Sequence, residues 1–136
     1  MPRKRGRKKK SETPETEEPI TESQDKQDKK EETEELKAKL EVIKDKPDVI
    51  GYILRNSRSA TIDAKDPTKI IDYALLSSST IDIAEELSNI FNLGECNKII
   101  VEGKNAKLLS ISIGENSISI FMDKKADTEK IHKELL

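Results

Sequence analysis

The chain has 136 residues and a formal net charge of -2 at pH 7, with 38% charged and only 3% aromatic residues. This length accommodates one ordinary domain, or a small domain with a tail, and it excludes two substantial hydrophobic cores. The single cysteine, Cys96, excludes an internal disulfide framework, and no apolar run reaches the length of a membrane-spanning helix, which predicts a cytoplasmic protein without membrane insertion.

The first 33 residues predict a disordered tail made of two blocks of opposite charge. Residues 1–10 carry seven basic and no acidic residues, whereas residues 11–35 carry eleven acidic and three basic residues. Aliphatic side chains are almost absent from the tail, so little apolar burial can offset the entropy lost on ordering. We therefore expect a disordered tail over residues 1–33 and one folded domain over residues 34–136.

The basic block contains Arg5-Gly6-Arg7, which resembles the core of an AT-hook. A glycine between two arginines lets the backbone lie flat in a narrow minor groove while both guanidinium groups enter it. Two interpretations stay open. The block could contact nucleic acid, or it could be a general polycation that aids solubility. The candidate nucleic-acid-binding residues are Arg3, Lys4, Arg5, Arg7, Lys8, Lys9 and Lys10.

A helix and a hairpin are predicted next along the chain. The segment TEELKAKLEVIKD, residues 33–45, places its apolar residues at helical spacing, and Pro47 ends that pattern. The two following segments, 48–57 and 58–64, are rich in β-branched residues and meet at polar turn residues, which is typical of a β-hairpin.

A long helix is predicted over about residues 67–92. Asp66 can cap its first turn, and Pro67 suits the first helical position because that position needs no N–H donor. Gly94, just after the last apolar residue, is the matching stop signal.

The rest of the chain predicts three strands, 98–103, 107–114 and 117–123, joined by short turns, and a last helix over about 127–135. The element order is therefore α-β-β-α-β-β-β-α. It favours an α+β fold with a five-stranded antiparallel sheet, the long helix on one face and the two terminal helices on the other.

The stretch IAEELSNIFNLGECNKIIVEGKNAKLLSISIGENSISIFMD resembles the Roadblock family, named for dynein light chains. The shared pattern is a long helix ending in a leucine-glycine-acid turn, a strand with an acid-glycine hairpin and two apolar strands, over residues 34–136. The resemblance implies a Roadblock fold. It also implies a dimer with itself or with a related Roadblock subunit, which binds and regulates Ras-like small GTPases or acts as an adaptor.

The sequence adds its own reasons to expect a dimer. Small side chains in the middle of the long helix would let a second helix approach closely, and the strand NKIIV would offer an unpaired edge. The alternative is a broken helix in which Ser79 or Thr80 caps a second segment. The predicted dimer interface consists of Ala74, Ser77, Ser78, Ile81, Asn97, Ile99 and Val101.

The outward residues of the long helix form an acidic platform in this interpretation. Asp82, Glu85, Glu86 and Asn89 are the predicted GTPase-binding residues, and their charge would steer a partner with a basic surface. The alternative is that these carboxylates only solvate an exposed helix face.

No enzyme activity is expected, and no cofactor or metal. The chain lacks the glycine-rich phosphate loop followed by Lys-Ser/Thr that a P-loop GTPase needs. Its only histidine, His132, falls in a charged terminal helix, and Cys96 is interpreted as a packing residue. The alternative is that the protein associates with nucleic acid. Its folded domain would then dimerise and join two basic tails, so that two weak nucleic-acid contacts combine into one stronger interaction.

Overall fold

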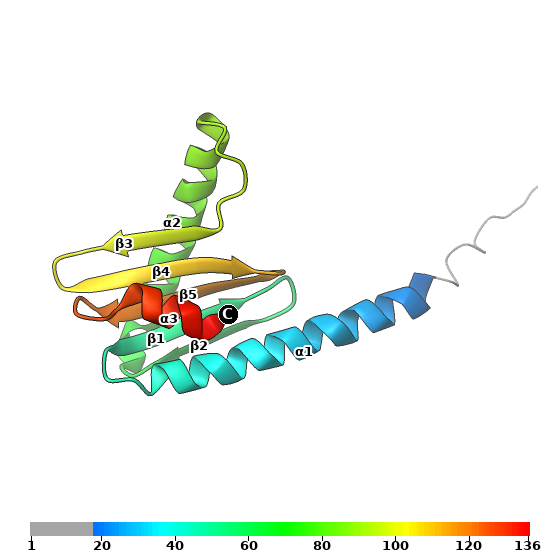
Figure 1. Cartoon of the computed structure of the whole chain (residues 1–136), viewed down its shortest axis with the longest axis horizontal. Helices are drawn as coiled ribbons and strands as arrows, with labels where there is room; N and C mark the ends of the chain where they lie inside the picture. The colour runs from blue at the N-terminus through cyan, green and yellow to red at the C-terminus, as the bar shows by residue number, and fades with distance from the viewer. Residues whose placement is uncertain (1–17) are drawn as a thin grey trace, which may run out of the picture. The chain divides into compact units, whose positions relative to one another are not determined.

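A computed structural model describes residues 18–136, with side chains from Asp28 onward. The contacts among residues divide the chain into two units, residues 1–34 and 35–136, and the second unit contains all the strands of the described residues. The elements are α1 (Glu18–Lys44), β1 (Val49–Arg55), β2 (Ala60–Ala64), the 3-10 helix η2 (Pro67–Lys69), α2 (Ile70–Ile90), β3 (Lys98–Glu102), β4 (Ala106–Ile113), β5 (Asn116–Asp123) and α3 (Thr128–Leu135) (Figure 1).

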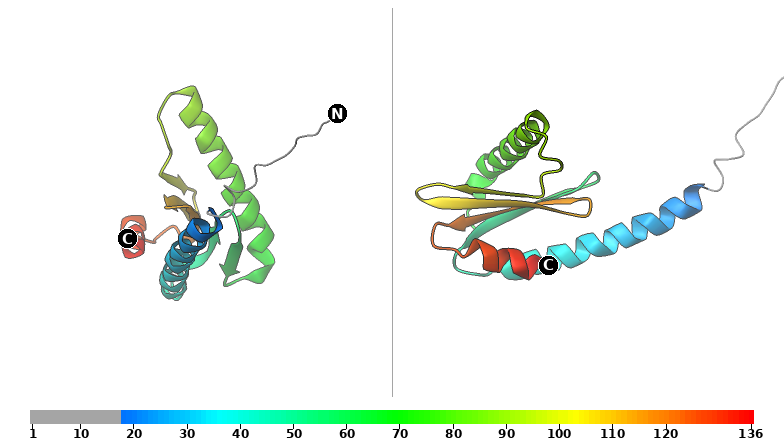
Figure 2. Two further views of the ribbon diagram at one scale, coloured as in Figure 1. Left: turned by 90° about the vertical axis from the view of Figure 1, so that its right-hand side faces the viewer. Right: turned by 45° about the horizontal axis from the view of Figure 1, so that its top comes forward.

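One five-stranded antiparallel sheet organises the second unit, in the strand order β2-β1-β5-β4-β3. Helix α2 covers one face, and the C-terminal part of α1 lies with α3 on the other face (Figure 2). This arrangement confirms the predicted α+β fold with its helices on both faces. The two edge strands are β2 and β3.

The larger hydrophobic core lies between the sheet and the pair α1 and α3. Apolar side chains at helical spacing on α1 meet alternate side chains of β1, β4 and β5 there. The Tyr52 hydroxyl, at the border of this core, donates a 2.6 Å hydrogen bond to Glu41 Oε1. Burial and the nearby carboxylate raise the pKa of Tyr52, so the phenol stays neutral. The core residues are Leu36, Leu40, Ile43, Val49, Tyr52, Leu54, Leu109, Ile111, Ile118, Ile120, Met122, Ala126, Ile131 and Leu135.

The core on the α2 face is much smaller. Its three buried members are Ile53, Leu108 and Phe121, one from each of β1, β4 and β5. The ring of Tyr73, from the first turn of α2, stacks on Phe121 with 4.5 Å between the ring centroids. This stack holds the N-terminal end of α2 against the sheet.

The beginning of α1 differs from the helix predicted over residues 33–45. It starts at Glu18, so Pro19 occupies the first turn, where a missing N–H costs little. Low hydrophobicity predicted disorder in this segment, because few apolar side chains can be buried there. Residues added to the end of an existing helix, however, do not need to form a new helix nucleus. The tail residues 1–17 lie outside the described residues.

Helix α2 is continuous from Ile70 to Ile90, so the alternative of a break with a cap near Ser79 is wrong. Asp66 caps the entry as predicted, since its Oδ1 accepts from Thr68 N–H at 3.0 Å. The exit uses Asn92, whose φ of 53° lets Leu93 N–H donate to Ser88 C=O. The stop therefore comes two residues before the predicted Gly94.

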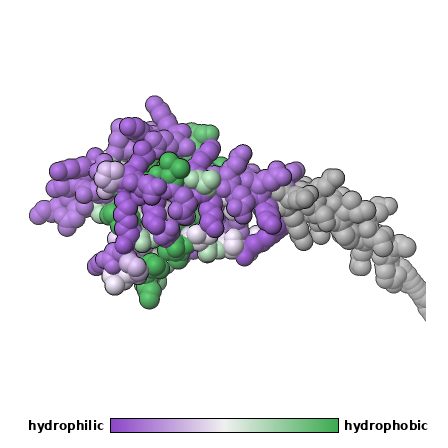
Figure 3. Space-filling model, turned by 90° about the horizontal axis from the view of Figure 1, so that it is seen from below, coloured by the Kyte–Doolittle hydropathy of each residue, from purple (hydrophilic) through white to green (hydrophobic). Residues whose placement is uncertain are grey.

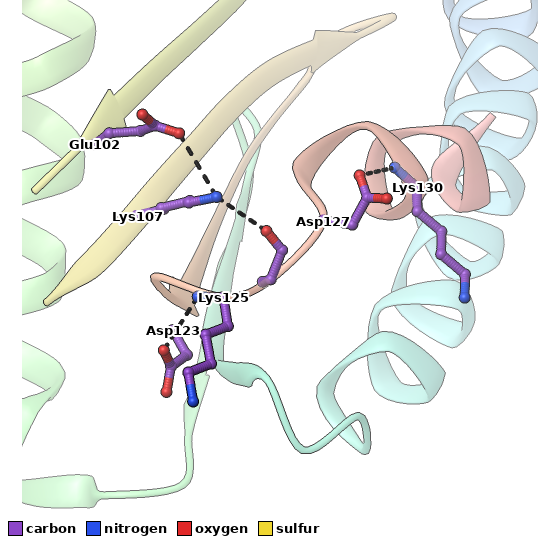
Figure 4. A network of polar contacts seen from close by, with 7 residues as sticks. Glu102, Lys107, Asp123, Lys125, Asp127 and Lys130 are labelled. Atoms are coloured by element: carbon purple, nitrogen blue, oxygen red, sulfur yellow. Dashed lines mark hydrogen bonds and ion pairs between the residues drawn. The ribbon is translucent and has the colours of Figure 1, made fainter.

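The connection from β5 to α3 is held by short-range polar contacts (Figure 4). Asp123 Oδ1 accepts from Lys125 N–H at 3.2 Å, and Asp127 caps α3 by accepting from Lys130 N–H. Lys107 Nζ, on β4, donates to Ala126 C=O at 3.0 Å. The Lys107 contact therefore ties this connection to the sheet, and the Asp127 cap fixes where α3 begins.

We expect Gly51→Ala to lower the free energy of unfolding by about 2 kcal/mol. A Cβ on Gly51 would lie 2.6 Å from Asp63 O and 2.9 Å from Ala64 Cα, and backbone atoms of a paired strand cannot move aside cheaply. Urea unfolding measures the loss. Gly103→Ala is the control, because its Cβ would lie 3.3 Å from Ala106 O, and an equal loss in both variants would contradict the argument.

Candidate functional site

Helix α2 presents three faces, about 120° apart when its residues are placed at 100° intervals. One faces the sheet, one is exposed and apolar, and one is exposed and acidic. The candidate functional site is built from the last two faces together with the neighbouring edge strand β3.

The sheet-facing side of α2 is held by hydroxyl groups. Ser77, which is fully buried, lies 2.6 Å from Ser119 of β5, Oγ to Oγ. Ser119 in turn lies 2.8 Å from Ser110 of β4. These three residues are called the serine triad. Because their side chains are small, the helix lies close to the sheet there, and the hydrogen bonds satisfy the buried hydroxyls.

The exposed apolar stripe of α2 consists of Leu76, Ile83, Leu87 and Ile90. These residues repeat at intervals of seven, four and three, which places them on one side of the helix. Phe91 and Leu93, just beyond the helix end, are also exposed, at 65% and 70%. The molecule seen from the α1 side is mostly hydrophilic (Figure 3). Several large apolar side chains exposed on one helix face, as on α2, are typical of an interaction surface.

The acidic stripe lies on the adjacent side of α2. Asp82, Glu85, Glu86 and Asn89 are all exposed, and their spacing of three, four and seven residues puts them on one face. Earlier on the same side, Ile71 and Leu75 are 73% and 63% exposed. The predicted GTPase-binding residues therefore share one accessible surface, and that surface offers apolar as well as charged contacts.

The predicted dimer-interface residues are divided between two environments. Ser77 belongs to the serine triad and Ala74 packs on the small core, so both are used by their own sheet. Ser78 Oγ accepts a 3.3 Å hydrogen bond from Arg55. Of the remaining members, Ile81, Asn97 and Ile99 line one recess between α2 and the sheet, and Val101 is exposed on β3.

The apolar stripe is the feature that sequence reasoning missed. The dimer expectation rests on the small serines, whereas large apolar residues are regularly spaced along the same helix at 76, 83, 87 and 90. A periodic pattern shows which residues share a face, but it does not say which face meets the sheet.

A shallow recess lies between α2 and the strands β3, β4 and β5. Its lining mixes Ile81, Ala84 and Ile99 with polar residues that include Glu85 and Ser110. Cys96 also lines it, half-buried, with Sγ 3.9 Å from Lys98 O.

Other sequence expectations concern metals, membranes and nucleic acids. Within residues 28–136, no group of three or more His, Cys, Asp or Glu side chains could hold a metal ion. None of the helices in the described part of the chain combines the length and apolar character needed to cross a bilayer. The seven candidate nucleic-acid-binding residues, within 3–10, lie outside the described residues.

No protein-family model and no curated protein matches the chain. Solved structures do match its fold. A Roadblock/LC7 domain from Streptomyces avermitilis is 17% identical with a TM-score of 0.55, over 65% of this chain and 78% of that chain.

Two further solved structures give the same result. Myxococcus xanthus MglB is 10% identical with a TM-score of 0.60, over 74% of this chain and 85% of that chain. The gliding protein MglB from Thermus thermophilus is 14% identical with a TM-score of 0.59, over 76% of this chain and 82% of that chain. The chain therefore has the Roadblock/LC7 fold, which confirms at the level of the fold the resemblance found in its sequence.

We expect Ser119→Ala to destabilise the protein by about 1–3 kcal/mol, because it leaves two buried hydroxyls without their shared partner. Urea unfolding measures the change. Ser112→Ala removes an exposed hydroxyl from the same face of β4 and is expected to change stability by less than about 0.5 kcal/mol. Equal effects would show that the serine triad does not hold α2.

Proposed function

We propose that this protein is a dimeric Roadblock-type scaffold that binds a Ras-like small GTPase and has no catalytic activity of its own. The observation that carries the proposal is the three-faced helix α2, with one face on the sheet and two faces exposed. The shared fold with a Roadblock/LC7 domain and with two MglB proteins supports it.

The apolar stripe of α2 is the proposed dimer interface, together with the open edge of β3. Burying one large aliphatic side chain contributes about 1.5–3 kcal/mol, and a two-fold axis makes every contact occur twice. In Figure 1 the C-terminal part of α2 runs past β3, beyond the edge of the sheet. A second copy on that side would cover both features at once.

The acidic stripe is the proposed GTPase-binding surface. It lies about 120° around α2 from the apolar stripe, so a dimer formed through the apolar stripe leaves it accessible. Carboxylates on an exposed surface raise the association rate of a basic partner and do so less at high salt. The neighbouring Ile71 and Leu75 supply apolar contact that is insensitive to salt.

We expect the full chain to sediment at twice its mass of 15.4 kDa, and Leu87→Asp to shift it to the monomer. The substitution places a charge where the stripe loses water on pairing. Val42→Asp is the matched control, because Val42 is 68% exposed on α1, away from the stripe, and it is expected to remain dimeric. A wild-type monomer at about 100 μM would contradict the dimer, since Kd would then exceed that concentration.

We expect the double variant Glu85→Lys and Glu86→Lys to bind its GTPase roughly tenfold more weakly at low salt, with a smaller loss at high salt. Binding is measured by titration calorimetry against purified Ras-like GTPases of the source organism, each loaded with GDP or with a non-hydrolysable GTP analogue.

The control is Glu31→Lys with Glu32→Lys, which makes the same charge change on α1. It is expected to bind as the unsubstituted chain does. If binding to a confirmed partner survives in the α2 variant, the GTPase-binding surface lies elsewhere. The sedimentation of both variants checks that they remain dimeric.

A further inference from the structure

The recess between α2 and the strands continues the row of hydroxyls that begins with the serine triad. Ser110 of β4 is paired with Ser119 of β5, and two residues along each strand, on the same face of the sheet, Ser112 is paired with Ser117. Ser77 of α2 covers the first pair, with its Oγ 2.6 Å from that of Ser119. The second pair lines the recess instead. The strand side of the recess therefore carries hydroxyl groups.

Two further polar side chains line the recess, Asn97 just before β3 and Glu85 of α2. Glu85 lies roughly 80° around the helix from Ser77, so it is at the boundary between the sheet-facing side and the acidic stripe. Within residues 28–136, the side chains of Glu85, Asn97, Ser112 and Ser117 form no hydrogen bond or ion pair. The recess thus offers several oxygen acceptors, of which Glu85 supplies a negative charge.

The rest of the recess is largely apolar. Ile81 and Ala84 of α2 and Ile99 of β3 line it, and all three are half-buried. A long side chain with an aliphatic stem and a cationic end matches this lining, because its methylene groups would contact the apolar residues while its polar end meets the acceptors. Arginine and lysine are the side chains of this kind.

We propose that the recess binds one arginine side chain of the partner GTPase. The inference rests on the GTPase contact proposed above and adds to it a defined contact point. A guanidinium group has several N–H donors in one plane and can satisfy separate acceptors at once, whereas a lysine ammonium is a compact point charge. The guanidinium pairs with the Glu85 carboxylate, and its other N–H groups donate to Asn97 Oδ1 and to the hydroxyls of Ser112 and Ser117.

The position of the recess agrees with the proposed GTPase contact. Glu85 belongs to the acidic stripe and to the recess, so one partner can contact both. Leu87, in the apolar stripe, lies roughly 160° around α2 from Glu85. A dimer formed through the apolar stripe therefore leaves the recess open.

An arginine of the chain itself lies on this side of α2 but binds elsewhere. Arg55 of β1 is the strand neighbour of Ser117, and its guanidinium donates a 3.3 Å hydrogen bond to Ser78 Oγ. Ser78 precedes Glu85 by seven residues, which is about 10 Å along the helix axis. Arg55 is therefore held two turns away and leaves the Glu85 carboxylate to a partner.

Two single substitutions separate the recess from the acidic stripe. Glu85→Gln and Glu86→Gln remove the same charge from adjacent residues, but Glu86 does not line the recess. We expect Glu85→Gln to weaken GTPase binding about fivefold at low and at high salt, because salt screens a contact inside a recess less than an exposed one. Glu86→Gln is expected to cost about twofold at low salt and less at high salt. Titration calorimetry measures both.

A double-mutant cycle identifies the residue that enters the recess. Each surface arginine and lysine of a GTPase that binds is replaced by alanine and titrated against the unsubstituted chain and the two glutamine variants. We expect one arginine whose replacement costs much less affinity in the Glu85→Gln chain than in the unsubstituted chain. The same arginine is expected to show no such coupling to Glu86→Gln.

Alkylation by N-ethylmaleimide tests the recess without changing a charge. Cys96 is the only cysteine of the chain and lines the recess, so the attached maleimide occupies the space that the arginine needs. We expect alkylation to weaken GTPase binding at least as much as Glu85→Gln does. Cys96→Ser is the control for the reagent, because its affinity is expected to be the same before and after treatment.

The possible outcomes separate this contact from the proposed function. Equal losses in Glu85→Gln and Glu86→Gln, or unchanged binding after alkylation, would overturn the recess contact and leave the GTPase surface of α2 in place. Coupling of Glu85 to a lysine would overturn the assignment to arginine. Loss of the dimer in Glu85→Gln with GTPase binding intact would show that a second copy occupies the recess. If the unsubstituted chain binds no GTPase, the proposed function fails, and the recess contact fails with it.

Discussion

The close contact of α2 with a narrow strip of small hydroxyl side chains is the constraint on which the rest of the structure depends. Ser77, Ser110 and Ser119 satisfy one another's hydrogen bonds, so the helix is held to the sheet along one line without a wide apolar seam. The small core beside them stabilises only the N-terminal end of α2, through the stack of Tyr73 on Phe121. The large apolar residues of α2 are consequently left on the outside.

This division of labour between the two sheet faces explains how one small domain carries both a core and an interaction surface. The side covered by α1 and α3 holds nearly all of the buried aliphatic residues, and it supplies most of the stability. The α2 side contributes less to the core, so most large apolar and acidic residues of α2 stay exposed. The helix therefore offers an apolar stripe, an acidic stripe and access to the edge of β3. The proposed dimer and the proposed GTPase contact then occupy different sides of the same helix.

Much of the architecture was predictable, because local chemistry marks it directly. Asp66 and Pro67 mark the N-terminus of the long helix, and short glycine-containing turns separate the last three strands. The start of α1 at Glu18 was not predictable from composition. Low hydrophobicity shows that a segment can bury little apolar surface, but residues that extend an existing helix need no burial and no new nucleus. The acidic stripe was also predictable, since charged residues at helical spacing are exposed on any packed helix.

The sequence by itself determined the order of elements, the fold class and the residues that share each helix face, because caps, turns and periodicity act within a few residues along the chain. Only the tertiary structure decided which face of α2 meets the sheet. Periodicity places Ser77 and Leu87 on different sides of the helix, and it is equally consistent with either side being covered. The choice depends on Ser110 and Ser119, which lie far from Ser77 along the chain. Their buried hydroxyls form a hydrogen-bonded cluster with the Ser77 hydroxyl, which an aliphatic side chain of α2 could not join. Such a match exists only after the strands have paired, so no local pattern encodes it.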